Sequence, residues 1–497
     1  CGLDSDKPVG LTPVVYDPVH LVHERAQAGQ DERLAQHKKR RHLRFTFGNL
    51  LHQEVRRNLA SSALLIAAAA PAALLTLTGK LLAPLASGKL MGRLREGYDL
   101  GIATSIEVNA AADADPAPTP AHPRSGFSDD EQLQRIAPFL QNLGLTGGFA
   151  PLVIFLGHGS SSQNNPHLAA YDCGACSGRH SGPNARIFCA MANRPIIRQR
   201  LADEYGIHIP ESTWFIGAEH NTCSEEIEWY DLDLIPEALN PNYQDLLQSL
   251  AKASLRHAQE RCRKFASAPS DPAPQKALDH VIGRAYDFTQ ARPELGHATN
   301  AAAFIGRRTL SQGAFFDRRV FLISYDYRID PEGEILERLL LANGPVGAGI
   351  SLEYYFSTVD NENYGAGTKI MHNVTGMLGV MEGASSDLKT GLPRQMIEIH
   401  EGMRLQVMCE ATTEMLTRIY MRQPPLQELI GNGWLLVSSK DPLTGEINVF
   451  NPEKGWLPWR GDPASIAISN SSAEWYRGHM EPLSPALIRQ QEETVNV

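Results

Sequence analysis

The sequence has no surplus of basic residues. Its 497 residues include 46 Lys and Arg against 56 Asp and Glu, so the formal net charge is 46 − 56 = −10. Proteins that bind nucleic acid normally carry a basic surplus, because they neutralise phosphates. The composition therefore argues against a nucleic-acid partner. With 42% hydrophobic and 21% charged residues, it also excludes a disordered chain and is typical of a globular protein.

Cysteine is scarce and its count is odd. There are seven cysteines, four of which lie between residues 173 and 223. A secreted disulfide framework would use an even, dispersed set, so we expect a reducing compartment and one local thiol site. No signal-peptide pattern precedes Cys1, and we expect that an upstream segment has been removed or was never included. A mature lipoprotein also begins with cysteine, but Gly2-Leu3-Asp4 adds little support for that alternative.

Long apolar runs are also rare. The uncharged stretch Asn58–Gly79 has 22 residues, which is long enough to span a bilayer. It is rich in Ala, which inserts weakly, and Pro71 interrupts it, so we predict a buried or interfacial helix pair broken at Pro71. Crossing a bilayer is the alternative. The basic run at 38–44 precedes it and is interpreted as a solvated helix face, or else as a contact with anionic lipid or a partner.

Strand-like and helix-like segments alternate along the rest of the chain. A helix with Ser128 as its N-cap is predicted over 128–143. The apolar run 151–156 is typical of a buried strand. Further strands are predicted at 214–217, 320–324 and 350–356, with helices at 193–205 and 243–265. This order predicts an α/β fold with a mostly parallel sheet flanked by helices, whose ligands bind at the carboxyl ends of the strands.

Composition divides the chain into three predicted ranges. The first, 1–126, is a helical region with the apolar helix, and it ends in a loop rich in Ala, Pro and Asp at 110–126. Such a segment cannot pack a core. The second, 127–440, is the α/β core. The third, 441–497, is a carboxyl-terminal extension and tail.

The segment 157–195 carries the strongest chemical signal. It places His158 between Gly157 and Gly159 at the end of the first strand. Five further nitrogen or sulfur donors follow within about thirty residues, namely His167, Cys173, Cys176, His180 and Cys189. Imidazole and thiolate together suit zinc, which takes about four such donors. The glycines would let the backbone pass close to a bound species.

Three interpretations of these residues stay open. In the first, Cys173, Cys176 and Cys189 form a closed structural zinc site with one His, although the second pair that a zinc knuckle needs is absent. In the second, Cys173 and Cys176 are a redox pair, although such pairs normally lie at a helix start near the end of a strand. In the third, His158 and Cys173 are two ligands of an open catalytic zinc site.

Other residues near this segment have weaker signals. Ser160 lacks the Gly-x-Ser-x-Gly pattern of a hydrolase nucleophile. Arg186 is interpreted as an anion-binding group or as a partner of surface acids. His220 follows the strand at 214–217 and is predicted to support the same crevice.

Several long blocks of the sequence resemble the DabA family, the large soluble subunit of a bacterial inorganic-carbon pump. They lie between about 130 and 440 and are GHGSSSQNNPHLAAYDCGACSGRHSGPNARIFCAMAN, IPESTWFIGAEHNT, NAAAFIGRR, EYYFSTVDNENYGAGTKIMHNVTGMLGVMEG and LKTGLPRQM. The resemblance implies a core and a zinc site like those of β-type carbonic anhydrases, with large helical insertions. It also implies a membrane partner, a cation-translocating (DabB-like) subunit.

The resemblance assigns half of a metal site to this chain. Family members hold Zn2+ with an upstream Cys-x-Asp-x-Arg motif, the His of Gly-His-Gly-Ser and the first Cys of Asp-Cys-Gly-Ala-Cys. The last two match His158 and Cys173, and the upstream motif is absent. The chain is therefore expected to be the carboxyl-terminal part of a longer protein and to be metal-poor alone. The expected surroundings of the metal are Gly157, Gly159, Asp172, Arg186 and His220.

The implied function is one-way hydration of CO2 to bicarbonate at the zinc site, within the full-length protein and its membrane complex. Energy coupling by the membrane partner would prevent back-reaction. The expected location is peripheral, at the cytoplasmic face of the bacterial inner membrane. A closed Cys/His zinc site in a non-catalytic scaffold is the alternative function, and a freely reversible carbonic anhydrase is a third.

Overall fold

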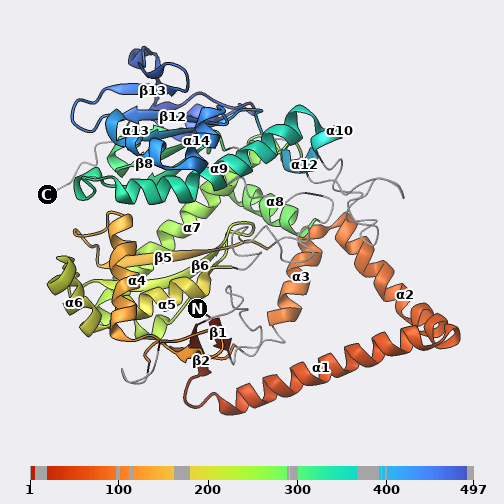
Figure 1. Ribbon diagram of the computed structural model, residues 1–497. Coiled ribbons are helices and arrows are strands. Elements are labelled where there is room, and N and C mark those ends of the chain that lie inside the picture. The colour runs from red at the N-terminus through yellow and green to blue at the C-terminus, as the bar shows by residue number, and fades with distance from the viewer. Residues whose placement is uncertain are drawn as a thin grey trace. The chain divides into compact units, whose positions relative to one another are not determined.

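A computed structural model describes the chain in two compact units. Unit 1 comprises 1–138, 146–254 and 279–288, and unit 2 comprises 139–145, 255–278 and 289–497. The described residues are 2–5, 19–96, 101–110, 117–161, 180–287, 290, 300–365, 391–392, 394–397 and 400–489. Each unit mixes helices and small sheets, which confirms the α/β class (Figure 1). The three ranges predicted from composition stay a prediction, because the two units are defined by contacts within the structure and do not test those ranges.

The first sheet of unit 1 contains two of the predicted strands. β5 (Leu152–Gly159) pairs in parallel with β6 (Trp214–Asn221), and β7 (Ile227–Trp229) pairs antiparallel with β6. Helix α5 (Gly182–Ala192) packs on β5 and β6, and α6 (Pro195–Tyr205) follows it as predicted. This parallel pair sets the carboxyl ends of both strands at one edge.

The second sheet of unit 1 comes from segments far apart in sequence. Its strands are β1 (Gly2–Ser5), β2 (His20–Ala26), β3 (Thr104–Glu107) and β4 (Arg124–Ser125). Between β2 and β3 the chain forms the helices α1 (Asp31–Arg57), α2 (Leu59–Leu82) and α3 (Pro84–Glu96). Consecutive members of this helical set contact each other (Figure 1).

Helix α2 contradicts the prediction of a buried helix pair broken at Pro71. It is one helix of 24 residues that contains Pro71, and none of its residues is buried. Proline removes a single helical hydrogen bond, and the surrounding Ala and Leu residues are the strongest helix formers. Within the described residues, α2 is the one helix long and apolar enough to cross a membrane. At about 1.5 Å per residue it is about 36 Å long.

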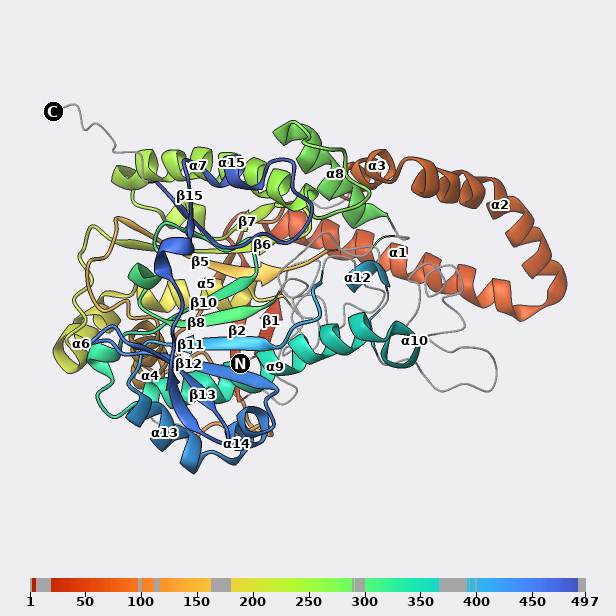
Figure 2. The same cartoon turned by 90° about the horizontal axis from the view of Figure 1, so that it is seen from above.

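Unit 2 contains a six-stranded sheet in the order β10-β8-β11-β12-β13-β14. The first four strands pair in parallel and the last three pair antiparallel (Figure 2). Their bounds are β8 (Ala302–Gly306), β10 (Val320–Ser324), β11 (Leu405–Cys409), β12 (Leu435–Lys440), β13 (Ile447–Asn451) and β14 (Gly455–Pro458). The predicted single, mostly parallel sheet is thus wrong in extent, because the described strands form four separate sheets. A β-carbonic-anhydrase-like core stays a prediction.

A smaller sheet and several helices complete the described part of the chain. The sheet consists of β9 (Ala314–Phe315), β15 (Ala467–Ser469) and β16 (Ala486–Ile488). The helices are α7 (Asn240–Cys262), α8 (Pro274–Tyr286), α10 (Asn361–Tyr364), α12 (Arg394–Ile397), α13 (Thr413–Arg422), α14 (Pro424–Gly431) and α15 (Ser472–Tyr476). The helix predicted at 243–265 corresponds to α7.

The strand predicted at 350–356 is wrong. These residues belong to helix α9 (Glu334–Val359), which packs with α14 and contacts β11 in the hydrophobic core of unit 2. Its buried face has a helical repeat that includes small or polar residues, namely Leu336, Leu340, Gly344, Ala348, Ser351, Tyr354 and Ser357. Because several of them are not recognisably apolar, the helical period was hidden, and the local apolar run was mistaken for a strand.

The N-terminus of helix α4 (Asp129–Asn142) confirms the predicted cap. The Glu131 amide donates to Ser128 Oγ at 3.2 Å, and the Ser128 amide donates to Glu131 Oε2 at 2.8 Å. This reciprocal pair is a capping box, which satisfies two amides that the helix leaves without intrahelical partners. Gly144, at φ +68°, follows the end of the helix.

Replacing Ser128 with Ala should lower the free energy of unfolding by about 1 kcal/mol, because the Glu131 amide loses its acceptor. Urea unfolding followed by circular dichroism measures the change. The matched control is Ser249→Ala, on an exposed position inside α7, which should be neutral or slightly stabilising. Equal effects of the two substitutions would contradict the capping role.

Candidate functional site

The candidate site lies where β5 and β6 end. Their parallel register makes His158 the Cα partner of His220, and Gly159 the partner of Asn221. Side chains of paired residues on parallel neighbours leave the sheet on the same face. The carboxyl edge of a parallel pair is also where ligands bind in α/β folds. The prediction that both strands contribute to one edge is therefore confirmed.

The glycines beside His158 make room for neighbouring parts of the protein. A Cβ on Gly157 would lie 2.5 Å from the Gly182 nitrogen, at the start of α5. A Cβ on Gly159 would lie 2.6 Å from Glu219 Oε1. Real Cβ atoms do not approach so closely, so both positions require glycine if α5 and Glu219 are to keep their places. The interpretation that these glycines also let the backbone approach a bound species stays a prediction.

Ser181 fixes the backbone of His158. The His158 amide donates to Ser181 Oγ at 2.5 Å, and the Ser181 amide donates to the His158 carbonyl at 2.9 Å. The side chain of His158 is half-buried. Its imidazole has no hydrogen-bond partner within the described part of the chain. The main chain is thus held at both polar groups, and the ring nitrogens are available to a ligand.

Glu219 joins a second imidazole to the start of α5. Its Oε2 accepts from His180 Nδ1 at 2.5 Å and from the Gly182 amide at 3.0 Å. The Glu219 side chain is 14% exposed and that of His180 is 36% exposed. The carboxylate contact at Nδ1 fixes the orientation of the His180 ring. In the sequence, Glu219 was indicated only by its position after the strand predicted at 214–217.

His220 forms a further carboxylate–imidazole pair. Its Nε2 lies 3.1 Å from Glu225 Oε2, and the Glu225 side chain is buried. Glu225 has a φ of +64°, which is uncommon for a residue with a side chain, and its amide donates to the Asn221 carbonyl at 2.8 Å. The structure thus brings His220 next to His158 in the register, as predicted. Its role in supporting a metal stays a prediction.

Cys223 was not singled out from the sequence, yet it lies beside the strand end. It is fully buried, and its Sγ lies 3.1 Å from Ser160 Oγ. Asn221 Oδ1 orders the same turn by accepting from the amides of Ser161 and Cys223. Since Ser160 is buried and contacts a thiol, its surroundings agree with the rejection of a hydrolase nucleophile.

Arg186 pairs with acids, as in the second of its two interpretations, although Glu24 is fully buried and Asp231 is only 20% exposed. Its guanidinium is 5% exposed and donates to Asp231 at 2.8 and 2.5 Å and to Glu24 at 2.8 Å. It also donates to the Thr104 hydroxyl and carbonyl at 3.2 and 2.9 Å. These five contacts use its donors. Although burial opposes the charge, hydrogen bonds and charges from Asp231 and Glu24 raise the pKa of Arg186.

Some of the predicted thiol ligands lie among the described residues and others do not. Asp172, Cys173 and Cys176 lie outside the described residues. Cys189 lies on α5, is 4% exposed, and burial raises the pKa of its thiol. This burial disfavours the thiolate that a metal requires. Among the described residues no group of three His, Cys, Asp or Glu side chains could hold a metal ion, so any zinc site needs donors beyond them.

Arg186→Met should lower the free energy of unfolding by about 3–5 kcal/mol, because Glu24 would remain buried without its charge partner. The measurement is urea unfolding followed by circular dichroism.

The matched control is Arg200→Met, which removes ion pairs with the exposed Asp130 and Glu204 and should cost about 1 kcal/mol or less. A loss for Arg186→Met no larger than that of the control would mean that the buried cluster does not stabilise the fold.

Comparisons with known proteins identify relatives of the chain. The family model "Probable inorganic carbon transporter subunit DabA" matches residues 1–435. A protein of that name from Methylococcus capsulatus is 56% identical over 487 residues, which cover 98% of this chain and 45% of the relative. One from Dechloromonas aromatica is 55% identical, with 98% and 48% covered. The chain thus spans less than half the length of these relatives. No solved structure matches.

Proposed function

The chain belongs to the DabA family, and from this premise we propose that it takes part in the uptake of inorganic carbon as CO2 and bicarbonate. The observation that carries the proposal is the family match over residues 1–435. The edge formed by β5 and β6 supports it, because it presents a backbone-fixed imidazole whose ring makes no hydrogen bond to the described residues, at the place where α/β folds bind ligands. This chain would act as part of a longer subunit.

In this proposal His158 and Cys173 hold a zinc ion together with donors from outside this chain. The available imidazole of His158 fits such a role, whereas the described residues alone do not complete a site. Zinc bound by imidazole and thiolate would lower the pKa of a water molecule, which allows hydration of CO2 to bicarbonate near neutral pH. In this proposal Gly157 and Gly159 help to position the metal ligand His158, because they leave room for the start of α5 and for Glu219 beside the strand end.

The two other imidazoles at this edge have distinct parts in the proposal. The pair of His220 with Glu225 orients a ring beside His158 in the strand register. The pair of His180 with Glu219 is partly exposed, so it can pass the proton that hydration releases to solvent. Imidazole suits proton transfer because its ordinary pKa of about 6.5 lies near neutrality. Arg186 contributes by holding α5 to its neighbours, since its donors are all engaged.

We further propose that a membrane cation-translocating subunit makes the hydration one-way, from a position at the cytoplasmic face of the inner membrane. The surface of α2 supports docking to this partner. Eight large apolar side chains of this helix are between 48% and 88% exposed, namely Leu59, Leu64, Ile66, Leu74, Leu75, Leu77, Leu81 and Leu82. Proteins that remain alone in water rarely expose apolar surface of this extent.

We expect His158→Ala, in the full-length protein expressed with its membrane partner, to reduce bound zinc at least tenfold. It should also abolish growth at low CO2, which requires uptake of inorganic carbon. The loss follows because one of the proposed metal donors is removed. Metal analysis of the purified complex and growth at low CO2 provide the two readouts.

The matched control is His208→Ala, on an exposed loop position, which should change neither readout. Cys189→Ser tests the closed structural site. If that substitution, rather than His158→Ala, releases the zinc and unfolds the protein, the catalytic proposal fails.

Leu74→Glu combined with Leu75→Glu should reduce the membrane-bound fraction of the full-length protein several-fold in cells that contain the partner. Two charges on the exposed face of α2 would oppose docking to an apolar surface. The fraction is measured by sedimentation of membranes and immunodetection. Leu443→Glu, at a position 82% exposed in unit 2, is the control, and an equal effect of both variants would contradict docking through α2.

A further inference from the structure

The helices between β2 and β3 carry a positive charge that the rest of the chain does not share. Residues 31–96 contain 12 Lys and Arg against 4 Asp and Glu, a net charge of 12 − 4 = +8. Because the whole chain has −10, the other residues together have −10 − 8 = −18. Five of the cations lie within residues 38–44 of α1, and no acidic residue occurs between Glu32 and Glu54. Positive charge is thus concentrated on one helix.

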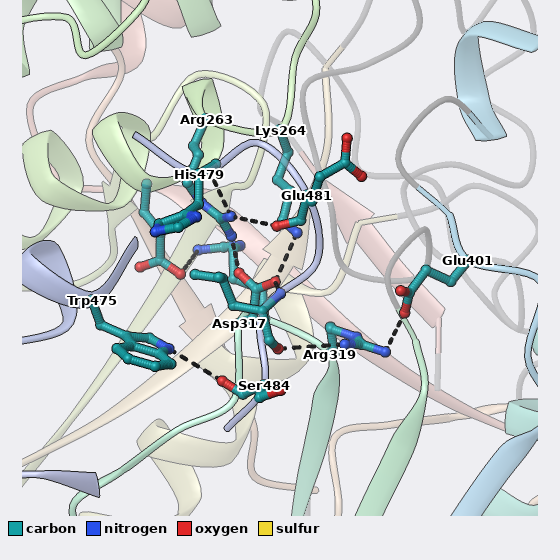
Figure 3. Close-up of polar contacts among 12 residues, drawn as sticks. Arg263, Lys264, Asp317, Arg319, Glu401, Trp475, His479, Glu481 and Ser484 are labelled. Carbon is teal, nitrogen blue, oxygen red and sulfur yellow. Dashed lines mark hydrogen bonds and ion pairs between the residues drawn. The ribbon is translucent and has the colours of Figure 1, made fainter. Parts of the chain in front are cut away.

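A cluster of cations in unit 2 shows the usual arrangement for comparison. Figure 3 shows Arg263 and Lys264 at the buried carboxylate of Asp317, and Arg319 at Glu401. Each of these cations therefore has a carboxylate partner. In α1, neither Lys39 nor Arg40 forms an ion pair with a carboxylate of the described residues, so their charge is available to a partner outside the chain.

The second sheet of unit 1 keeps α1, α2 and α3 on one side of any membrane. β2 precedes α1 and β3 follows α3, and the two strands pair antiparallel. A single crossing by α2 would place these paired strands on opposite sides of the bilayer. Helix α1 cannot make a second crossing because 11 of its 27 residues are charged. Helix α3 has 13 residues and is about 20 Å long, which is too short. Where these helices meet a membrane, they lie along its surface.

One side of α1 combines exposed apolar side chains with two of the cations. Leu43, Phe47 and Leu50 follow a spacing of four and three residues, which aligns them on the helix surface, and they are 58%, 70% and 54% exposed. Lys39 lies four residues before Leu43, and Arg40 lies seven before Phe47, so both belong to the same side. Over residues 38–52 the opposite side is polar apart from Phe45, with the exposed residues Lys38, Arg41, Asn49 and His52.

This arrangement is typical of a helix that lies in the interface of an anionic bilayer. In that setting the apolar side chains enter the boundary of the acyl chains, while Lys and Arg extend to the lipid phosphates. Each cation close to the surface adds attraction to anionic lipid. An acidic protein face or a nucleic acid would match the cations of α1 but not the apolar side chains between them. The combination therefore favours lipid.

We propose that α1 binds anionic phospholipid headgroups through Lys39 and Arg40, with Leu43, Phe47 and Leu50 in the membrane interface. This contact lies next to α2, which meets the membrane partner in the function proposed above. The inference rests on the membrane location in that proposal and adds a direct contact with lipid. It gives the chain an affinity for anionic membranes that does not require the partner.

The test measures co-sedimentation of the whole chain with lipid vesicles in the absence of the membrane partner. Vesicles of phosphatidylcholine alone are compared with vesicles that also contain phosphatidylglycerol. We expect at least tenfold stronger binding to the anionic vesicles. The preference should disappear at about 1 M salt, where the Debye length is about 3 Å. Equal binding to both kinds of vesicle overturns the proposal. Binding to neither kind also overturns it and assigns the basic side of α1 to a protein surface.

Two pairs of substitutions with the same change in charge sharpen the experiment. Lys39→Gln combined with Arg40→Gln should weaken binding to the anionic vesicles at least tenfold, because two cations leave the lipid surface. Lys454→Gln combined with Arg460→Gln, at exposed positions of unit 2, should leave binding unchanged. Phe47→Ser should weaken binding several-fold by removing apolar contact with the interface. Equal effects of the two charge pairs overturn the proposal.

The outcome is separable from that of the proposed function. The vesicles contain no partner, whereas docking through α2 is measured in cells that contain it, and the zinc site is measured by metal content. Loss of vesicle binding would leave those two results unchanged. Conversely, preferential binding to anionic vesicles would stand even if substitutions on α2 had no effect in cells.

Discussion

The close packing of the first turn of α5 against the ends of β5 and β6 is the constraint on which the candidate site depends. Gly157 and Gly159 leave room for the helix start and for Glu219, and Ser181 holds both polar groups of the His158 backbone. A strand end is ordinarily free to fray. Here the backbone is fixed from outside the strand, so the direction in which the imidazole leaves the sheet is fixed as well, and no described residue makes a hydrogen bond to the ring.

At this edge, two imidazoles and one guanidinium are each paired with a carboxylate. His180 and His220 each face a carboxylate, while Arg186 is enclosed by Glu24 and Asp231 and serves packing. A guanidinium with all donors engaged cannot attract a substrate anion. The edge formed by β5 and β6 therefore offers imidazole nitrogen rather than unpaired positive charge.

The sequence by itself determined the local elements whose signals are contiguous: the apolar run of β5, the capping box at Ser128, and His158 at a strand end among metal-binding residue types. Tertiary structure decided which distant groups meet. The contacts of Arg186 with Glu24 and Asp231 depend on segments brought together by folding. So does the formation of a helix rather than a strand at 350–356. Periodicity and spacing report a residue's neighbours along the chain, whereas burial and charge pairing are set by neighbours in space.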